Sequence, residues 1–389
     1  MFSSRVPGDL SPNPLAVAVE RMRLSGRGFD DLTASNPTEA GFDYPADLFA
    51  PLASAAALRY DAKPFGLPAA REAVAADYAR RGVKVAASHV ALTASSSESY
   101  SLLFKLLCDP GDSVLVPTPS YPFFEHLTRL DNVQARPYGT QYHGTWTIDL
   151  EDLKYAISDT TRAILVVSPN NPTGAWLKRD ELATLTELCA ERGLALIGDE
   201  VFADYAIDPA PASQASVVEH GDVLTFSLGG LSKSVGLPQV KLGWIAASGP
   251  SPQLSAALTR LELIADTYLS VGTPVQMAAA HLLNAGASVR DQIRRRVLEN
   301  YRALTELATA CNACQVLRAE GGWTAVVRTP HTMPEEERTI RLLEDHHVLV
   351  HPGYFFDFPH DGYVVVSLLP RPDIFRAAAA RLFHAIAAG

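Results

Sequence analysis

The stretch Ser227-Leu-Gly-Gly-Leu-Ser-Lys-Ser-Val-Gly-Leu-Pro238 places a single lysine, Lys233, in a loop of small residues. The apolar run 223–226 before it is typical of a buried strand. Partial burial lowers the pKa of a lysine, and a lysine that is neutral near physiological pH can form an imine with a carbonyl group. Small neighbours also leave room for a flat ring against the backbone. An exposed lysine in a glycine-rich loop is the alternative interpretation, and this stretch alone does not decide between them.

Length and composition indicate a two-domain globular protein. The chain has 389 residues, of which 47% are hydrophobic and 20% charged. The net charge of −10 disfavours a nucleic-acid partner, which usually requires a basic face. No apolar run reaches the ~18 residues of a membrane span, and the N-terminus lacks the apolar centre of a signal peptide. With four cysteines in a chain this long, we expect no disulfide scaffold and a cytoplasmic location.

Between residues 88 and 250, short apolar runs alternate with longer helical patterns. Such runs are expected for strands that are buried on both faces of a parallel sheet. The alternation therefore predicts an α/β layer architecture. The predicted strands include 90–93, 113–116, 163–167 and 194–197, and the predicted helices include 97–107 and 178–192, the latter ending at Gly193.

The two ends of the chain differ from this pattern. The first 40 residues are irregular and rich in proline, and the residues after Thr273 combine long helical patterns with hairpin-like strands. We therefore predict a large α/β domain over residues 41–280 and a smaller α+β domain formed by residues 1–40 together with 281–389. The helical patterns cover 15–24, 289–309, 335–346 and 372–388, and the strands lie around 322–327.

Polar side chains follow two of the predicted strands. The pair Asp199-Glu200 lies at the edge where open α/β sheets bind ligands. A carboxylate there can pair with a protonated ring nitrogen, but taken alone a helix cap is the simpler interpretation. In Ser168-Pro-Asn-Asn-Pro-Thr-Gly174, the asparagine Asn171 is either a rigid hydrogen-bond donor or part of a tight turn.

Two further segments carry groups suited to a flat, phosphorylated ligand. Ser96 and Ser97, between a predicted strand and a predicted helix, form either a phosphate cradle or an ordinary helix cap. Tyr121, in a proline-rich loop, can stack on a flat ring or pack in the core. None of these segments is decisive singly. All of them fall at the carboxyl ends of predicted parallel strands, which is difficult to explain by chance.

Taken in order, these segments resemble the class I/II aminotransferases, the fold-type-I enzymes that use pyridoxal 5'-phosphate (PLP). The resemblance covers nearly the whole chain and implies a mostly parallel seven-stranded central sheet flanked by helices. It also implies transfer of an amino group between an amino acid (or amine) and a 2-oxo acid by a ping-pong mechanism. The matching positions are Tyr60, Gly66, Arg71-Glu72, Asp109-Pro-Gly-Asp112, Asn171-Pro-Thr-Gly174, Asp199-Glu-Val and Ser232-Lys233.

By this resemblance, Lys233 carries PLP as a Schiff base and later moves the substrate proton. Asp199 pairs with the pyridine nitrogen, Asn171 donates to the phenolic oxygen, and Tyr121 stacks on the ring. The X-Pro bonds that correspond to positions often cis in the family precede Pro119 and Pro172.

The resemblance also assigns a phosphate site. Its ligands are Ser96, Ser97 and Ser232, together with Lys241, which stands where the family usually has an arginine. Lysine keeps the positive charge but not the bidentate geometry. Tyr60 corresponds to a tyrosine that reaches the phosphate of the neighbouring subunit, which implies a homodimer with shared active sites.

Two more departures concern the substrate and the ring. Phe202 replaces a tyrosine that normally donates to the phenolic oxygen, and Tyr205 is offset from it by three residues. Val365 occupies the position of the arginine that binds the substrate carboxylate. Arg371, in the following loop, either takes over this role or is a solvated arginine.

Arg371, Asn36 and Trp323 are thus the candidate substrate-binding residues, with a core role as the alternative for Trp323. We predict no metal site, because Cys311-Asn-Ala-Cys314 has no second pair. The predicted partners are a small-molecule amino donor and keto-acid acceptor. A PLP-dependent lyase, decarboxylase or racemase stays open as an alternative function, and a PLP-binding regulatory protein is a weaker one.

Overall fold

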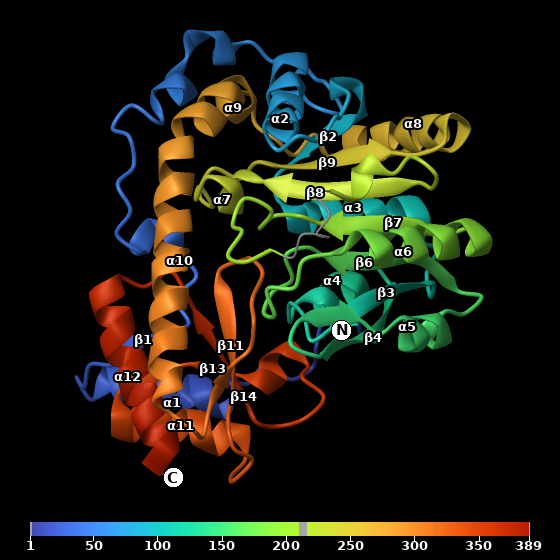
Figure 1. Cartoon of the computed structure of the whole chain (residues 1–389). Helices are drawn as coiled ribbons and strands as arrows, with labels where there is room; N and C mark the ends of the chain where they lie inside the picture. The colour runs from blue at the N-terminus through green and yellow to red at the C-terminus, as the bar shows by residue number, and fades with distance from the viewer. Residues whose placement is uncertain (1, 210–215, 389) are drawn as a thin grey trace.

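The computed structural model describes residues 2–209 and 216–388, and its largest unit is an eight-stranded sheet with helices on both faces (Figure 1). β8, β7, β6, β3 and β4 are neighbours and run parallel. The predicted α/β class and mostly parallel sheet are confirmed. The described residues form one strand more than the predicted seven, because β4 continues into a hairpin with the short β5. In sheet order the strands are β2 (Val90–Thr93), β9 (Gly243–Ser248), β8 (Thr225–Gly230), β7 (Ala195–Asp199), β6 (Thr161–Val167), β3 (Ser113–Thr118), β4 (Gln134–Tyr142) and β5 (Trp146–Ile148).

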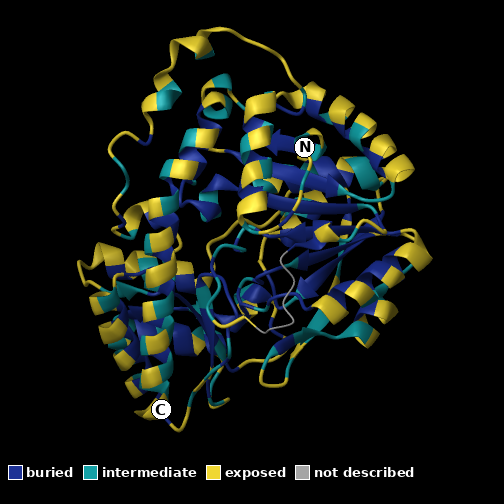
Figure 2. Ribbon diagram, turned by 45° about the horizontal axis from the view of Figure 1, so that its top comes forward, coloured by how far each residue is buried: buried dark blue, intermediate teal, exposed yellow. Residues whose placement is uncertain are grey.

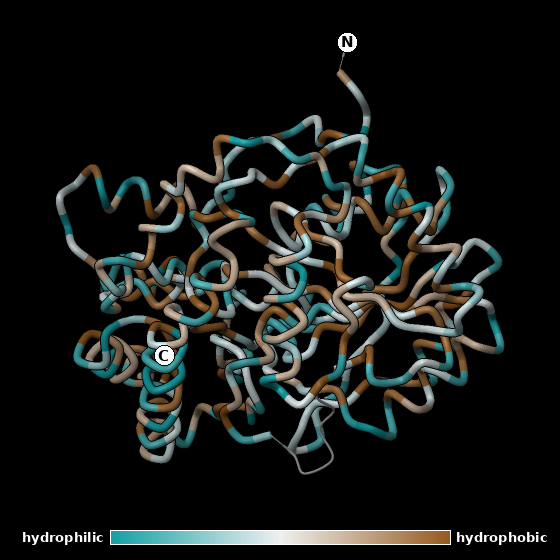
Figure 3. The backbone as a smooth tube through the Cα atoms, turned by 90° about the horizontal axis from the view of Figure 1, so that it is seen from above, coloured by the Kyte–Doolittle hydropathy of each residue, from teal (hydrophilic) through white to brown (hydrophobic). Residues whose placement is uncertain are grey.

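Side chains that alternate along the strands form a separate hydrophobic core on each face of the sheet. On β3, for example, Leu115 packs into one core and Val114 into the other. Figure 2 shows the buried strands between helices whose outer surfaces are exposed, and Figure 3 shows hydrophobic segments concentrated in the interior. The helices α2 (Pro68–Arg80), α6 (Arg179–Arg192) and α9 (Thr273–Ala285) contribute to one core, and α3 (Ser96–Leu107) and α8 (Ser251–Tyr268) to the other. The shorter α4 (Phe124–Leu130) and α5 (Leu150–Ala156) both pack on β4.

A second sheet, with four antiparallel strands, lies beside the carboxyl ends of the large one (Figure 1). The long helix α10 runs from α9 down to α12 and connects the two regions. The N-terminal segment joins the second region because β1 pairs with β12. The division of the chain at residue 281 stays a prediction. In sheet order the strands are β10 (Gln315–Val316), β11 (Thr324–Arg328), β14 (Tyr363–Ser367) and β13 (His351–Pro352); β1 is Asp30–Asp31 and β12 is Val348–Leu349. The helices are α1 (Pro14–Leu24), α10 (Ala287–Thr309), α11 (Glu335–His346) and α12 (Pro372–Ala388).

The two regions are tied together by a buried ion pair. Lys178, just before α6, donates to the carboxylate of Glu320, just before β11, at 2.6 Å, and Glu320 is only 1% exposed. The ammonium also donates to the Trp146 carbonyl at 2.9 Å. Because both charges are removed from water, each depends on the other for stabilisation.

Glu320→Ala should lower the free energy of unfolding by about 3 kcal/mol, because it leaves the Lys178 ammonium buried without its carboxylate. Urea unfolding followed by circular dichroism measures this loss. Arg318→Ala is the matched control, because its ion pair with Asp208 is exposed and is worth at most about 1 kcal/mol. Equal effects of the two substitutions would contradict a structural role for the buried pair.

Candidate active site

A cavity of about 350 Å³ lies where the carboxyl ends of the parallel strands approach the four-stranded sheet. This volume is within the range of pockets that bind small molecules. The large sheet contributes residues that end or follow β2, β3, β6, β7 and β8, and the smaller sheet contributes residues of β11, β13 and β14. The structure thus brings together seven of the predicted site residues: Ser96, Ser97, Tyr121, Asn171, Asp199, Lys233 and Trp323.

Lys233 reaches the cavity from α7 (Leu231–Ser234), a single helical turn directly after β8. Its Nζ lies 5.2 Å from the ring centre of Trp323 and 5.8 Å from that of Phe202. Burial lowers the pKa of Lys233, and the carboxylate of Asp199 opposes this shift without cancelling it. The side chain therefore has the partly buried environment that imine formation requires.

The backbone of α7 is fixed by two buried side chains. The Tyr205 hydroxyl donates to the Lys233 carbonyl at 2.5 Å and to the Ser234 carbonyl at 3.3 Å. Arg290 of α10 donates its Nε–H to the same Ser234 carbonyl at 2.9 Å. Tyr205 is thus committed to positioning α7 and does not supply the donor that Phe202 lacks.

Asp199 ends β7 with its carboxylate on the cavity and only 9% of the residue exposed. Tyr100 donates its hydroxyl to Oδ2 at 2.7 Å, and the Val201 N–H donates to Oδ1 at 3.1 Å. Burial raises the pKa of Asp199, and the two hydrogen bonds act in the opposite direction. The site therefore contains a buried carboxylate that is oriented from one side and open to the cavity.

The first turn of α3 forms another part of the cavity wall. Ser95 caps the helix by accepting from the Glu98 N–H at 3.2 Å, so Ser96 and Ser97 occupy its first two positions. Their N–H groups have no acceptor within the helix, and the positive end of the helix dipole lies there. Together with the serine hydroxyls they form a suitable phosphate site.

Asn171 and Tyr121 lie on loops that contain cis prolines. The bonds before Pro119 and Pro172 are cis, as predicted, and the bond before Pro169 is also cis. Burial raises the pKa of the Tyr121 hydroxyl, which keeps it protonated at neutral pH.

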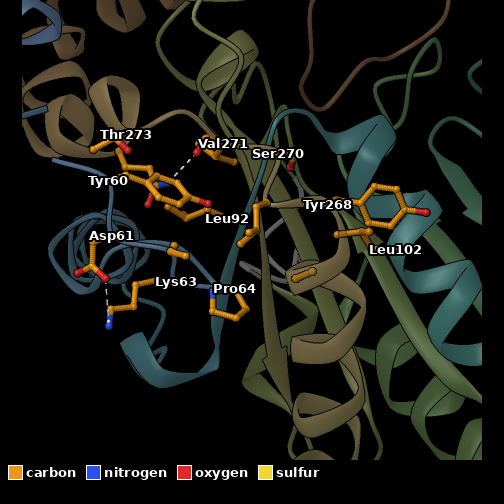
Figure 4. Close-up of a pocket in the computed structure, with 15 residues that line it drawn as sticks. Tyr60, Asp61, Lys63, Pro64, Leu92, Leu102, Tyr268, Ser270, Val271 and Thr273 are labelled. Carbon is orange, nitrogen blue, oxygen red and sulfur yellow. Dashed lines mark hydrogen bonds and ion pairs between the residues drawn. The ribbon is translucent and has the colours of Figure 1, made fainter. Parts of the chain in front are cut away.

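Five predicted site residues do not line this cavity. Ser232 is partly buried, and Lys241 is exposed with a left-handed backbone, φ 58°. Asn36 caps a short 3₁₀ turn by accepting from the Thr38 N–H at 3.1 Å. The side chain of Arg371 is 63% exposed and pairs with Asp373. Tyr60, 71% exposed, lies on a separate small pocket that Tyr268 and Thr273 also line (Figure 4).

The geometry also reveals residues that sequence reasoning missed. Tyr100 follows Ser96 by four residues, one helical turn, and this spacing was a usable signal. Thr33, Ser35 and His351 also line the cavity. Their approach depends on the pairing of β1 with β12 and of β13 with β14, for which the sequence carries no comparable signal.

Comparison with known proteins agrees with this geometry. Residues 56–380 match the family model "Aminotransferase class I and II". The chain belongs to this family. It is 26% identical over 370 residues to glutamate-pyruvate aminotransferase AlaA of Escherichia coli K12, and the aligned region covers 92% of this chain and 91% of that protein. It is 27% identical over 383 residues to an alanine aminotransferase of Mycobacterium tuberculosis, with 95% and 88% covered.

Solved structures show the same fold. An alanine aminotransferase from Pyrococcus furiosus superposes with a TM-score of 0.89 at 24% identity, covering 99% of both chains. An aspartate aminotransferase from Thermus thermophilus with maleate gives a TM-score of 0.83 at 24% identity, again over 99% of both chains.

The chain is therefore a PLP-dependent aminotransferase that acts on amino acids and keto acids. The residues around the cavity fit this cofactor, since an amine, a buried carboxylate and a helix N-terminus surround one space. In the described ranges, no group of three or more His, Cys, Asp or Glu side chains is arranged to hold a metal ion. No helix in the described part of the chain is both long and apolar enough to cross a membrane.

Gly243→Ala should weaken PLP binding about tenfold, equivalent to about 1.4 kcal/mol. A Cβ at Gly243 would lie 2.9 Å from the Ser95 carbonyl carbon and 2.9 Å from Thr93 Oγ1, so the start of α3 would have to shift. Titration of the apoprotein with PLP, followed by absorbance, measures the change. Gly221→Ala is the control, because its Cβ would meet nothing within 4 Å. Unchanged affinity in Gly243→Ala would show that the start of α3 does not hold the phosphate.

Proposed function

We propose that this chain transfers amino groups in two half-reactions at the cavity that contains Lys233. In the first, an amino acid would give up its amino group and leave as a 2-oxo acid, and in the second a different 2-oxo acid would take up that group. The observation that carries the proposal is the convergence of Lys233, Asp199 and the start of α3 on one cavity. A lyase, decarboxylase or racemase would also use the first two residues, but the family assignment favours amino transfer.

PLP, when bound, supplies the carbonyl that takes up the amino group and the conjugated ring that withdraws electrons from the substrate Cα. Lys233 would hold the cofactor covalently and, once released, would carry the proton from the Cα of the donor. Its pKa, lowered by burial, favours the neutral amine that this proton transfer requires. The rings of Trp323 and Phe202, whose centres lie 5.2 and 5.8 Å from the amine, would restrict access of water to it.

Three further residues would orient the cofactor. Asp199, oriented by hydrogen bonds from Tyr100 and the Val201 N–H, would face a protonated ring nitrogen. Asn171 would donate to the phenolic oxygen, and Tyr121 would cover one face of the ring. Because Phe202 has no hydroxyl, the phenolic oxygen would have one donor fewer from this chain.

The phosphate would bind at Ser96 and Ser97, which line the cavity. Ser232 and Lys241 do not line it and stay predicted ligands. The exposure of Tyr60 on a separate pocket is consistent with a role in a second subunit. We therefore also propose a homodimer in which each subunit completes the site of the other. The absence of disulfides among the four cysteines is compatible with the cytoplasm as the location.

The test is a cofactor spectrum of the purified protein, titrated with amino donors and then with 2-oxo acids. Glutamate, alanine and pyruvate are the first compounds to use, because relatives are named for them. A donor should remove the absorbance band of the aldehyde form, and a 2-oxo acid should restore it. Lys233→Ala should reduce transfer by about 10³-fold or more while the far-UV spectrum is unchanged. The exposed Lys84→Ala is the control. Substrate consumption without conversion of the cofactor would refute amino transfer.

Tyr100→Phe should reduce kcat by about tenfold and move the acidic limb of the pH–rate profile to higher pH. The Tyr100 hydroxyl favours the ionised Asp199, so its loss raises the pKa of Asp199. The carboxylate is then lost earlier as the pH falls, and a charge-assisted hydrogen bond of about 1.5 kcal/mol corresponds to this rate loss. Steady-state rates across the pH range measure both effects. Tyr138→Phe, which removes a buried hydroxyl bonded to the Leu165 carbonyl, should leave the profile unchanged.

A further inference from the structure

The cavity has two chemically different ends. The lining residues proposed to hold the cofactor all end or follow strands of the large sheet. The opposite end is formed by Thr33 and Ser35, by Thr324 of β11, by His351 of β13 and by Ser367 of β14, with the rings of Phe355 and Phe356 beside them. An amino acid joined at Lys233 would extend toward this second end.

Both the amino donor and the 2-oxo acid carry a carboxylate. A carboxylate that leaves water needs a hydrogen-bonding partner, and a cationic partner is the strongest. Among the described residues that line the cavity, the side chains with nitrogen are Asn171, Lys233, Trp323 and His351. Only Lys233 and His351 can become cations, and Lys233 is reserved for the cofactor.

At this second end, the substrate end, three of the four hydroxyl groups already donate to protein oxygens. Ser367 donates to the Ala34 carbonyl at 2.5 Å, Thr33 donates to Asp31 at 2.5 Å, and Thr324 donates to the Pro172 carbonyl at 3.0 Å. The indole N–H of Trp323 is enclosed by protein atoms. None of these groups can offer a cationic donor to a carboxylate, and among the described side chains that line the cavity only Lys233 and His351 can.

His351 stands directly opposite Val365 in the β13–β14 pair. Val365 is fully buried and packs with Val326, Phe356 and other apolar residues, so it contributes no polar atom. The imidazole instead lines the cavity, 5.7 Å from the ring centre of Phe356 and 5.9 Å from that of Phe355.

We infer that His351, in its protonated form, binds the carboxylate of the amino acid and of the 2-oxo acid. This inference rests on the proposed function, because it assigns a role in substrate binding at the same cavity. It replaces Arg371, which lies outside the lining and pairs with Asp373.

Surrounding charges define the pH dependence that follows. Burial lowers the pKa of His351, and Asp31 of β1 raises it in part. Glu335 of α11, which packs on β13, accepts from the N–H groups of Tyr354 and Tyr363. Across the cavity lie Lys233 and Asp199. The free cavity thus favours neutral imidazole, whereas a bound carboxylate favours imidazolium. Binding therefore takes up a proton, and affinity falls by up to about tenfold per pH unit above the pKa of His351.

The direct test uses a carboxylate that cannot react. Isothermal titration calorimetry of the PLP-loaded enzyme at pH 7.5, in two buffers of different ionisation enthalpy, would compare 3-methylbutanoate with 3-methylbutanamide. We expect the acid to bind at least about tenfold more tightly and with proton uptake. His351→Gln should weaken binding of the acid about tenfold or more, abolish proton uptake and leave binding of the amide unchanged. His351→Arg should restore binding of the acid without proton uptake. The exposed His384→Gln is the matched control.

A kinetic test separates this inference from the proposed function. The half-saturating concentration of leucine in the first half-reaction should rise in His351→Gln, whereas that of 3-methylbutylamine should not. An enzyme that transfers amino groups normally in His351→Gln, with unchanged proton uptake on acid binding, overturns the inference alone. A wild-type enzyme whose cofactor spectrum responds to no donor overturns the proposed function, while the calorimetry still reports on His351.

Discussion

The parallel register of β6, β7 and β8 determines where Asn171, Asp199 and Lys233 lie. Val167 pairs with Asp199, and Asp199 pairs with Leu228, so the three strands reach the same edge of the sheet together. The segments that carry Asn171 and Lys233 begin at this edge, so both side chains lie on the same cavity as the Asp199 carboxylate. A one-residue slip of β7 would turn Asp199 to the opposite face and remove it from the cavity.

Two carboxylates are buried at that edge, one on each face of the sheet. Hydrogen-bond donors beside each carboxylate offset the free-energy cost of removing its charge from water. Asp199 and Glu200 are adjacent and therefore point to opposite sides. Asp199 faces the cavity, while Glu200 accepts from the hydroxyls of Ser216 and Ser227 and from the Val217 N–H at 2.7 Å. Burial raises the pKa of both carboxyls, and these donors favour the ionised forms. The two adjacent carboxylates thus have different roles. Asp199 faces the cavity, and Glu200 accepts hydrogen bonds from neighbouring segments of the large domain.

Much of the cofactor end was predictable because it depends on local signals. Apolar runs marked the strands, Gly193 ended α6 with φ 66°, and helices α11 and α12 have the predicted bounds. Once the strands are parallel, a residue just after a strand must lie at the common edge, which located Lys233, Asp199 and Asn171. Asn36 and Arg371 had no such constraint. Each lies in an irregular segment and interacts with a residue nearby in the sequence: Asn36 accepts from the Thr38 N–H, and Arg371 pairs with Asp373.

The substrate end was harder to predict because long-range pairing builds it. Thr33 follows β1, which pairs with β12 more than 300 residues later in the chain. His351 reaches the cavity through two-residue β13, whose register with β14 cannot be inferred from so short a pattern. The cofactor end and the substrate end therefore belong to different sheets. Residues at the substrate end can therefore change without disturbing the parallel strands that hold Lys233 and Asp199.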